Sequence, residues 1–342
     1  MSDLLTGFLS ALLATNQPAA LSNLVQQKTG LRVEVTDPND PVEQAYQKLL
    51  LEDDDAQAEV ERWRAETAQS GTRSDVLLAA LEARVRDRFQ KVQRGYVEFL
   101  AAHPKHANAR IAYASFLNET GEEEAGAAEL DRVLQLDPKN PAALNNLANF
   151  HGHAGDVKKA FDLYARAIAV ATNESLYYQN FATTVFLFRK DAMEFYKIDE
   201  QGVFAKAMAL YRRALELDPN DFLLASEVAQ THYGIILPKL EDPAKQRAAE
   251  LNLAEEALAA WRKALVLAQE GLQREGVLIH LARWQGRAGR LDEARQLLDN
   301  ITNQVLAVTK ERVLRHLGER ETRGSTNRPP AAAPANSAPP NK

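Results

Sequence analysis

The sequence predicts an all-α protein made of repeated helix-turn-helix units. No segment alternates apolar and polar residues as a half-buried strand would, and helix starts are easy to recognise. From about residue 104, one pattern of helix-facing residues returns at regular intervals. With 342 residues, of which 45% are hydrophobic and 26% charged, the chain has the composition of a soluble protein with a core.

The first helices precede the repeats. Asp40, Pro41 and Glu43 supply an N-cap, a proline at the first helical position and a capping-box carboxylate. Further helices are expected from about Asp55 to Gln69 and from about Asp75 to Ala102, with a short polar turn between them.

The repeated helix face carries a small residue, then a large one, then a second small or apolar one, at steps of four and three. Small residues let two helices approach closely, and the large residue fills the space against the next helix pair. The pattern occurs as Gly126-Leu130-Val133, Ala160-Tyr164-Ala167, Ala207-Tyr211-Ala214, Ala257-Trp261-Ala264 and Ala294-Leu298-Ile301.

The turns repeat together with the helices. Gly121 and Gly155 are 34 residues apart, and "LQLDPKN" at 134–140 returns as "LELDPND" at 215–221. Small-aromatic-small second helices, a glycine between helices and a closing Asp-Pro resemble the tetratricopeptide repeat (TPR) family. The tryptophan usual in the family's first helix is replaced here, for example by Leu144.

The resemblance implies a right-handed superhelical solenoid of TPR helix-turn-helix repeats, with an N-terminal helical cap and a disordered C-terminal tail. We expect the N-terminal helical region and cap at 1–103 and about five repeats at 104–317. The Pro/Ala-rich composition of 318–342 cannot bury a core, so we expect a disordered tail there.

Two repeats carry insertions between their helices, near 187–202 and 236–252. Each insertion either lengthens a helix or forms a loop that contacts a partner. Met193, Phe195 and Tyr196 are the candidates for such a contact, because apolar side chains in a loop must pack back or meet a partner.

In proteins that resemble this one, the first helices of successive repeats line the concave side of the superhelix. Carried over position by position, the resemblance implies a groove rich in amides and hydroxyls, which suit the backbone of an extended peptide. The groove positions are Asn108, Ile111, Ser115, Asn118, Asn145, Asn146, Asn149, His153, Gln179, Thr183, Ser226, Gln230, Tyr233, Ile279, Arg283 and Arg287.

Arg283 and Arg287 are the sharpest binding feature, because a spacing of four places both guanidinium groups on one helix face. Together they can hold an acidic side chain or a C-terminal carboxylate. The alternative is a pair of solvated surface arginines. The carboxylate clamp of TPR proteins that bind chaperone C-termini is absent, since its places hold Ile111, Leu176 and Asn180.

The sequence predicts no metal site and no cofactor. His151 and His153 point in different directions on a helix, so they cannot share a metal ion; we interpret His151 as a core histidine. The acidic run 52–55 lacks the central glycine and alternating ligands of a calcium loop, so we interpret it as a charged helix N-terminus. The chain contains no cysteine, so disulfides and thiolate chemistry are excluded.

Residues 4–13 place leucine and phenylalanine at helical spacing and predict a short amphipathic helix that cannot span a membrane. The helix packs on the rest of the protein, anchors the chain to a membrane or partner, or is a signal segment that has lost its basic start. Asp3 stands where a signal peptide carries positive charge. We therefore expect a cytoplasmic protein, or a periplasmic or secreted one if this segment is a truncated signal.

A net charge of −6 makes nucleic acid a poor partner. The sequence contains no glycine-rich phosphate loop, nucleophile elbow or H-E-x-x-H motif, so we expect no enzyme.

The leading hypothesis is a non-catalytic protein–protein interaction scaffold that binds an extended peptide or partner segment in its concave groove. The alternative is an accessory structural subunit of a larger assembly, for example at a cell envelope, attached through the N-terminal amphipathic helix. Membrane contact is expected only through residues 4–13.

Overall fold

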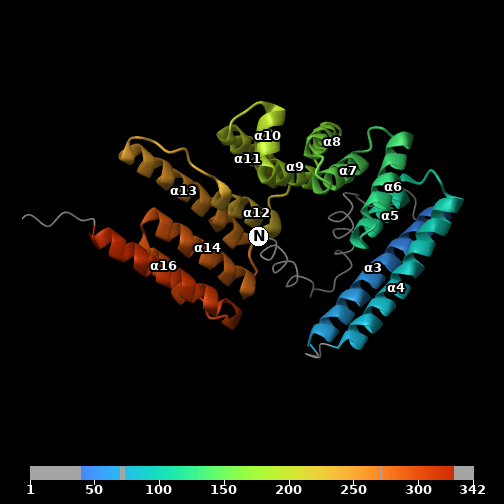
Figure 1. Cartoon of the computed structure of the whole chain (residues 1–342), viewed down its shortest axis with the longest axis horizontal. Coiled ribbons are helices and arrows are strands. Elements are labelled where there is room, and N and C mark those ends of the chain that lie inside the picture. Colours follow the sequence, from blue (N-terminus) through green and yellow to red (C-terminus); the bar gives the residue numbers. More distant parts are fainter. Residues whose placement is uncertain (1–39, 70–73, 270, 327–342) are drawn as a thin grey trace, which may run out of the picture. The chain divides into compact units, whose positions relative to one another are not determined.

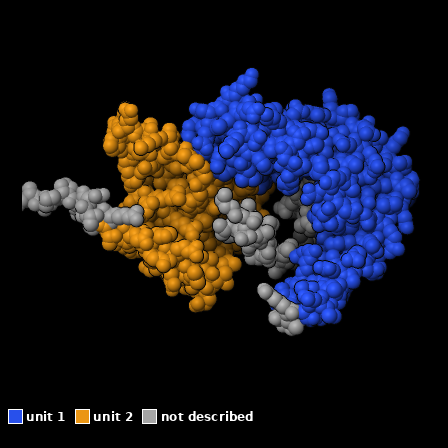
Figure 2. Space-filling model, viewed as in Figure 1, with its two compact units in different colours: residues 1–217 blue, residues 218–342 orange. Residues whose placement is uncertain are grey.

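The computed structural model describes residues 40–69, 74–269 and 271–326, and all regular elements within these ranges are helices (Figure 1). The chain divides into two compact units, residues 1–217 and 218–342 (Figure 2). Inside each unit the helices pack one after another in chain order, so the predicted all-α solenoid of helix pairs is confirmed.

Unit 1 begins with a long helical hairpin and continues with three helix pairs. The hairpin consists of α3 (Pro41–Gln69) and α4 (Asp75–Ala102). The pairs are α5 (Ala107–Glu119) with α6 (Glu123–Leu136), α7 (Pro141–His153) with α8 (Val157–Val170), and α9 (Ser175–Leu187) with α11 (Glu200–Leu217). In each pair the first helix carries the predicted groove positions.

The start of α3 matches the prediction, whereas its interior does not. Asp40 caps the helix, because its Oδ1 accepts a hydrogen bond from the Val42 amide at 2.9 Å. The helix then runs without a break to Gln69, so the prediction of a separate helix beginning near Asp55 was wrong.

Partners on α4 explain why an acidic run is tolerated inside α3. Arg88 forms ion pairs with Glu52 and Glu59, each at 2.6 Å. The Tyr96 hydroxyl donates to Asp53 at 2.7 Å. These contacts from a distant part of the sequence bind three carboxylates within or near the run, so no helix end is needed to stabilise them.

The small-large-small triplets form the centre of the core, as predicted. Every residue of the five triplets is buried. Gly126 shows why the small positions matter, since a Cβ placed there would lie 2.8 Å from the Ala114 carbonyl oxygen of the paired helix. The turn glycines are also confirmed: Gly121 and Gly155 adopt φ values of +86° and +91°, which favour glycine.

Unit 2 contains two further helix pairs and a closing helix. The first pair is α12 (Phe222–Thr231), extended by the 3-10 turn η1 (His232–Gly234), with α13 (Pro243–Leu267). The second pair is α14 (Leu272–Ala288) with α15 (Leu291–Asp299), followed by the turn η2 (Gln304–Leu306) and α16 (Ala307–Thr326). The closing helix continues past Leu317, so it is longer than composition indicated; residues 327–342 lie outside the described residues.

The first insertion forms a separate helix, α10 (Arg189–Tyr196), rather than a lengthened neighbour. Ala192 is fully buried, and the rings of Phe195 and Tyr196 both lie 5.5 Å from the ring of Phe161. The insertion therefore packs back onto the core of unit 1, although Phe195 remains partly exposed.

The second insertion ends by lengthening a helix, as expected. Residues 235–242 have no helical structure, and α13 then begins at Pro243. Asp242 caps it by accepting a hydrogen bond from the Ala244 amide at 2.8 Å. Among the described residues, no helix combines the length and apolar character that membrane spanning requires. The predicted amphipathic run at 4–13 lies outside these residues.

Candidate functional site

The predicted groove residues Asn145 and Asn146 bond to each other, and Asn180 of the next repeat, which was not a predicted groove position, bonds to Asn145. Asn145 Nδ2 donates to Asn146 Oδ1 at 3.0 Å, and Asn180 Nδ2 donates to Asn145 Oδ1 at 3.2 Å. Asn145 is 1% exposed and Asn146 7% exposed. These side chains therefore link α7 to α9, and only a small part of them faces solvent.

A second-helix tyrosine continues this set of hydrogen bonds. The Tyr164 hydroxyl donates to Asn149 Oδ1, and Thr184 Oγ1 donates to the Tyr164 hydroxyl at 3.3 Å. Burial raises the pKa of Tyr164 to about 12, so the hydroxyl keeps its proton. We refer to Asn145, Asn146, Asn149, Tyr164, Asn180 and Thr184 as the polar row.

The other groove positions of unit 1 differ in accessibility. Ile111 is fully buried in the core, so it is not available to contact a ligand. Ser115 is half-buried and its hydroxyl donates to the Ile111 carbonyl oxygen at 3.2 Å. Asn108 and His153 are exposed. Asn118, Gln179 and Thr183 are half-buried; Thr183 Oγ1 lies 3.0 Å from the Tyr211 hydroxyl.

In unit 2, three predicted groove residues line one cleft of about 430 Å³. Tyr233 comes from η1, and Arg283 and Arg287 come from α14. The closing helix α16 contributes Arg312, His316 and Arg320. We call the space lined by these six residues the basic cleft; Gly286, Val313, Leu317 and Glu319 complete its wall.

Positive charge in the basic cleft is not neutralised by nearby carboxylates. Four arginines line the cleft with one carboxylate, Glu319. The ion pairs of unit 2 among described residues use Arg247, Arg290 and Arg295, which lie elsewhere. Although the Arg287 side chain is exposed, partial desolvation lowers the pKa of its guanidinium; Tyr233 raises this pKa, and the like charges of Arg320 and Arg283 lower it. The cleft therefore favours an anion.

Two aromatic rings, those of Trp284 and Tyr233, pack against Arg287 in the basic cleft. The Arg287 guanidinium lies 4.4 Å from the Trp284 ring centre and 5.0 Å from that of Tyr233, which is cation–π distance. The Tyr233 hydroxyl lies 3.1 Å from His280 Nδ1, and burial raises the pKa of Tyr233 to about 12. The half-buried Tyr233 is thus held between two residues of α14.

Three remaining groove predictions do not join the basic cleft. Ile279 is buried in the core of unit 2, so it is not available as a groove contact. Gln230 is exposed. Ser226 is half-buried, and its hydroxyl oxygen has no hydrogen-bond partner among the described residues.

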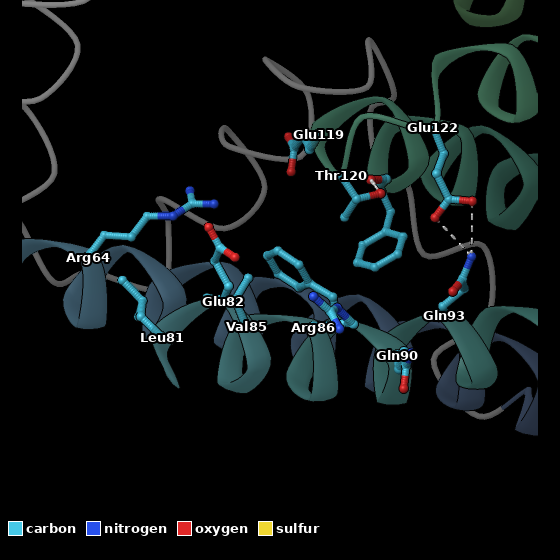
Figure 3. A pocket seen from close by; sticks show the side chains of 12 residues that line it. Arg64, Leu81, Glu82, Val85, Arg86, Gln90, Gln93, Glu119, Thr120 and Glu122 are labelled. Carbon is cyan, nitrogen blue, oxygen red and sulfur yellow. Dashed lines mark hydrogen bonds between the residues drawn. The ribbon is translucent and has the colours of Figure 1, made fainter. Parts of the chain in front are cut away.

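Unit 1 contains a second cavity, of about 450 Å³, that the sequence reasoning missed (Figure 3). Its apolar wall includes Leu81, Val85 and Phe89 of α4 and Phe116 of α5. The polar residues around this wall carry charges of both signs, and Gln93 Nε2 donates to Glu122 at 3.2 Å. The i, i+4, i+8 spacing along α4 is the signal that would have indicated it.

The histidines give no metal site. His232 is buried and its Nδ1 lies 3.0 Å from the Val228 carbonyl oxygen. His151 is half-buried rather than a full core residue. Its burial lowers the pKa of the imidazole, and the positive charge of Lys159 contributes a smaller lowering. Within the described ranges, no three histidine, aspartate or glutamate side chains are grouped as metal ligands.

Stacked helix pairs with glycine turns define a helical repeat protein of the solenoid class. Residues 129–162, which run from α6 through α7 into α8, match the tetratricopeptide repeat family model. This match falls on helix pairs that carry the buried triplets, so residues 129–162 are similar to a tetratricopeptide repeat in both sequence pattern and packing. No curated protein matches the sequence significantly.

Several solved structures are similar to this chain. PilF of Pseudomonas aeruginosa shows 16% identity over 78% of this chain and 99% of its own, with a TM-score of 0.46. PilW, described as a type IV pilus biogenesis factor, shows 16% identity over 70% of this chain and 95% of its own, with a TM-score of 0.46. YrrB, described as a TPR protein with an unusual peptide-binding site, shows 16% identity over 66% of this chain and 97% of its own, with a TM-score of 0.44.

Proposed function

We propose that this protein is a non-catalytic protein–protein interaction scaffold whose first helices bind an extended segment of a partner protein. An acidic part of that segment lies in the basic cleft of unit 2. The observation that carries the proposal is the convergence of four arginines from two helices on a cleft with a single carboxylate. Arg283 and Arg287 were the pair whose spacing predicted a carboxylate contact.

The arginines of the basic cleft are more stable with a bound carboxylate than with water as their only partner. A guanidinium fork binds a carboxylate through two parallel hydrogen bonds. Repulsion between Arg287 and its neighbours Arg320 and Arg283 makes the cleft without a ligand electrostatically unfavourable. An entering carboxylate relieves this repulsion, so binding gains energy without requiring a change of fold.

A short acidic stretch is a better ligand than nucleic acid. The chain has a net charge of −6, which repels a long polyanion. The four arginines line a cleft of about 430 Å³, which accommodates a few side chains. A protein segment with acidic residues beside neutral ones matches both properties.

The proposal is tested with the full chain and a hexaglutamate peptide in a calorimetric binding assay. Replacing both Arg283 and Arg287 by alanine is expected to weaken binding by at least tenfold, since each charge-assisted hydrogen bond contributes about 1.5–3 kcal/mol. The control removes two charges elsewhere in unit 2, through Arg262→Ala and Lys263→Ala. Equal affinities of the two double variants would refute the cleft as the binding site.

The same variants allow a partner to be identified. Affinity capture with wild type and the Arg283→Ala, Arg287→Ala variant is followed by mass spectrometry. A genuine partner is retained by wild type and by the control variant and lost by the cleft variant. Attachment to a larger assembly through residues 4–13, and the compartment, stay predictions because these residues lie outside the described ranges.

A further inference from the structure

We infer that His280 and Tyr233 are positioning residues of the basic cleft, which hold Arg287 where it binds the partner's carboxylate. This inference rests on the proposed function of the same cleft. It extends that proposal by assigning a role to His280, which does not line the cleft, and to the uncharged Tyr233, which lines it beside Arg287.

Four rings in successive contact connect α13, α14 and η1 next to Arg287: one pair is stacked and two pairs are tilted. Trp261 of α13 lies flat against His280 of α14, with ring centres 4.1 Å apart and planes inclined by 3°. His280 contacts Tyr233 of η1 at a ring distance of 5.7 Å, and Tyr233 contacts Trp284 at 4.9 Å. Arg287 covers the last two rings.

The hydrogen bond between Tyr233 and His280 has a defined direction. Burial, with a smaller contribution from the nearby Arg283, lowers the pKa of His280 to about 3, so the imidazole is neutral at pH 7. Tyr233 keeps its proton because burial raises its pKa to about 12. Of the two neutral tautomers, we assign the one with its ring proton on Nε2, in which the tyrosine hydroxyl donates to His280 Nδ1.

Of the two rings that contact Arg287, Tyr233 is held less firmly by packing than Trp284, so its position depends more on the hydrogen bond to His280. Trp284 is 1% exposed and belongs to a helix of 17 residues, so packing fixes its ring. Tyr233 is half-buried and belongs to η1, a turn of three residues that is followed by chain without regular structure. The contact with His280 ties the tyrosine to α14, the helix that also carries Arg287.

The position of Arg287 depends on these rings because its charged neighbours oppose it. Arg283 and Arg320 both repel its guanidinium. The cation–π contacts with Tyr233 and Trp284 offset this repulsion and leave fewer orientations for the guanidinium. A preorganised arginine loses less entropy when it binds a carboxylate, so the rings strengthen binding indirectly.

The test combines binding of the hexaglutamate peptide with a double-mutant cycle on the full chain. His280→Phe and Tyr233→Phe each keep an aromatic ring and remove one partner of the hydrogen bond. Each single variant is expected to weaken binding by about three- to tenfold, and the double variant by no more than either single one. The salt dependence of binding stays at the wild-type value, because neither variant removes a cleft charge.

Nitrogen NMR of the histidine side chains supplies a reading that does not depend on the peptide. At pH 5, His280 is expected to be the neutral Nε2–H tautomer with a hydrogen-bonded Nδ1, and Tyr233→Phe shifts only the Nδ1 resonance. The inference is overturned if His280 is an imidazolium at pH 5, or if the Nδ1 chemical shift is the same in wild type and in Tyr233→Phe.

The outcomes separate the two proposals. If Arg283→Ala with Arg287→Ala abolishes binding while His280→Phe and Tyr233→Phe stay within twofold of wild type, the positioning role is overturned and the proposed function stands. If wild type does not bind the peptide at all, the proposed cleft function fails, and the positioning role fails with it. Additive losses in the double variant would mean that the two residues act separately, which also contradicts the inference.

Discussion

Replacing Tyr164 by phenylalanine tests whether the polar row of unit 1 holds the repeats together. The Tyr164 side chain is 2% exposed, and its hydroxyl bonds to Asn149 and Thr184. Phenylalanine keeps the ring and its stacking on Phe181, whose centre lies 5.5 Å away. The substitution therefore removes one oxygen atom and the two hydrogen bonds that it makes.

The expected loss of stability depends on whether Asn149 and Thr184 find other hydrogen-bond partners once the Tyr164 hydroxyl is removed. A neutral hydrogen bond contributes about 1 kcal/mol net, and a buried group left without a partner costs about 1–3 kcal/mol. Thr184 keeps its bond to the Asn180 carbonyl oxygen at 2.9 Å, and the half-buried Asn149 can turn towards water. We therefore expect a loss of about 1–2 kcal/mol rather than the larger figure for orphaned groups.

The assay is urea denaturation of the full chain followed by circular dichroism. Because two units and stacked repeats need not unfold together, hydrogen exchange read by mass spectrometry assigns the loss to α7–α9. Tyr178→Phe is the matched control, since its hydroxyl is exposed and its bond to the Thr172 carbonyl oxygen is long, at 3.4 Å. If both variants lose less than about 0.5 kcal/mol, the polar row does not stabilise the repeats and its amides remain available to a ligand.

Other substitutions test the helix contacts, the turns and the buried histidine. Gly126→Ala is expected to cost about 1–3 kcal/mol in chemical denaturation, because its Cβ would overlap the Ala114 carbonyl oxygen; an unchanged midpoint would contradict the close helix approach. Gly155→Ala has open space around it, so its cost of about 1 kcal/mol comes from the φ of +91° alone, and a raised melting temperature would contradict it. Lowering the pH from about 6.5 to about 3 is expected to reduce stability by up to about 1.4 kcal/mol per pH unit, because the unfolded chain protonates His280 and the folded chain does not. Denaturation over this range should show a smaller slope in His280→Phe, and equal slopes would refute the assigned pKa.

Local periodicity explains why the repeats were predictable. The buried triplets and the turn glycines depend on spacings within one helix pair, which the sequence displays directly. The continuity of α3 was not predictable in this way. An acidic run is a local signal for a helix start, and only contacts with Arg88 and Tyr96 of another helix explain why it lies inside one.

The same distinction applies to the binding surface. Arg283 and Arg287 could be paired from the sequence, because they are one turn apart on a single helix. Their meeting with Arg312 and Arg320 depends on how α16 packs against α14, which no spacing reveals. Asn145 was expected in an open groove, yet the amide of Asn180 from the next repeat occupies its oxygen.

The packing of α16 against α14 leads to the prediction that connects the fold most directly with binding. Gly286 of α14 faces Leu317 of α16, and a Cβ at this glycine would overlap the leucine Cδ2 atom. Gly286→Ala is therefore expected to displace the closing helix and with it the arginines that α16 contributes to the basic cleft. The overlap involves the single side chain of Leu317, which is buried and moves with its helix, so the chain should stay folded at a cost of about 1–3 kcal/mol.

The expected result of Gly286→Ala is a several-fold loss of affinity for the hexaglutamate peptide at nearly unchanged helix content. Gly318→Ala is the matched control, since it makes the same chemical change on α16 where a Cβ would meet no atom within 4 Å. Alanine is also a better helix former than glycine, so the control variant should be slightly more stable than wild type. Wild-type affinity in Gly286→Ala would mean that arginines of α14 alone bind the peptide, and that the convergence of two helices has no part in the function.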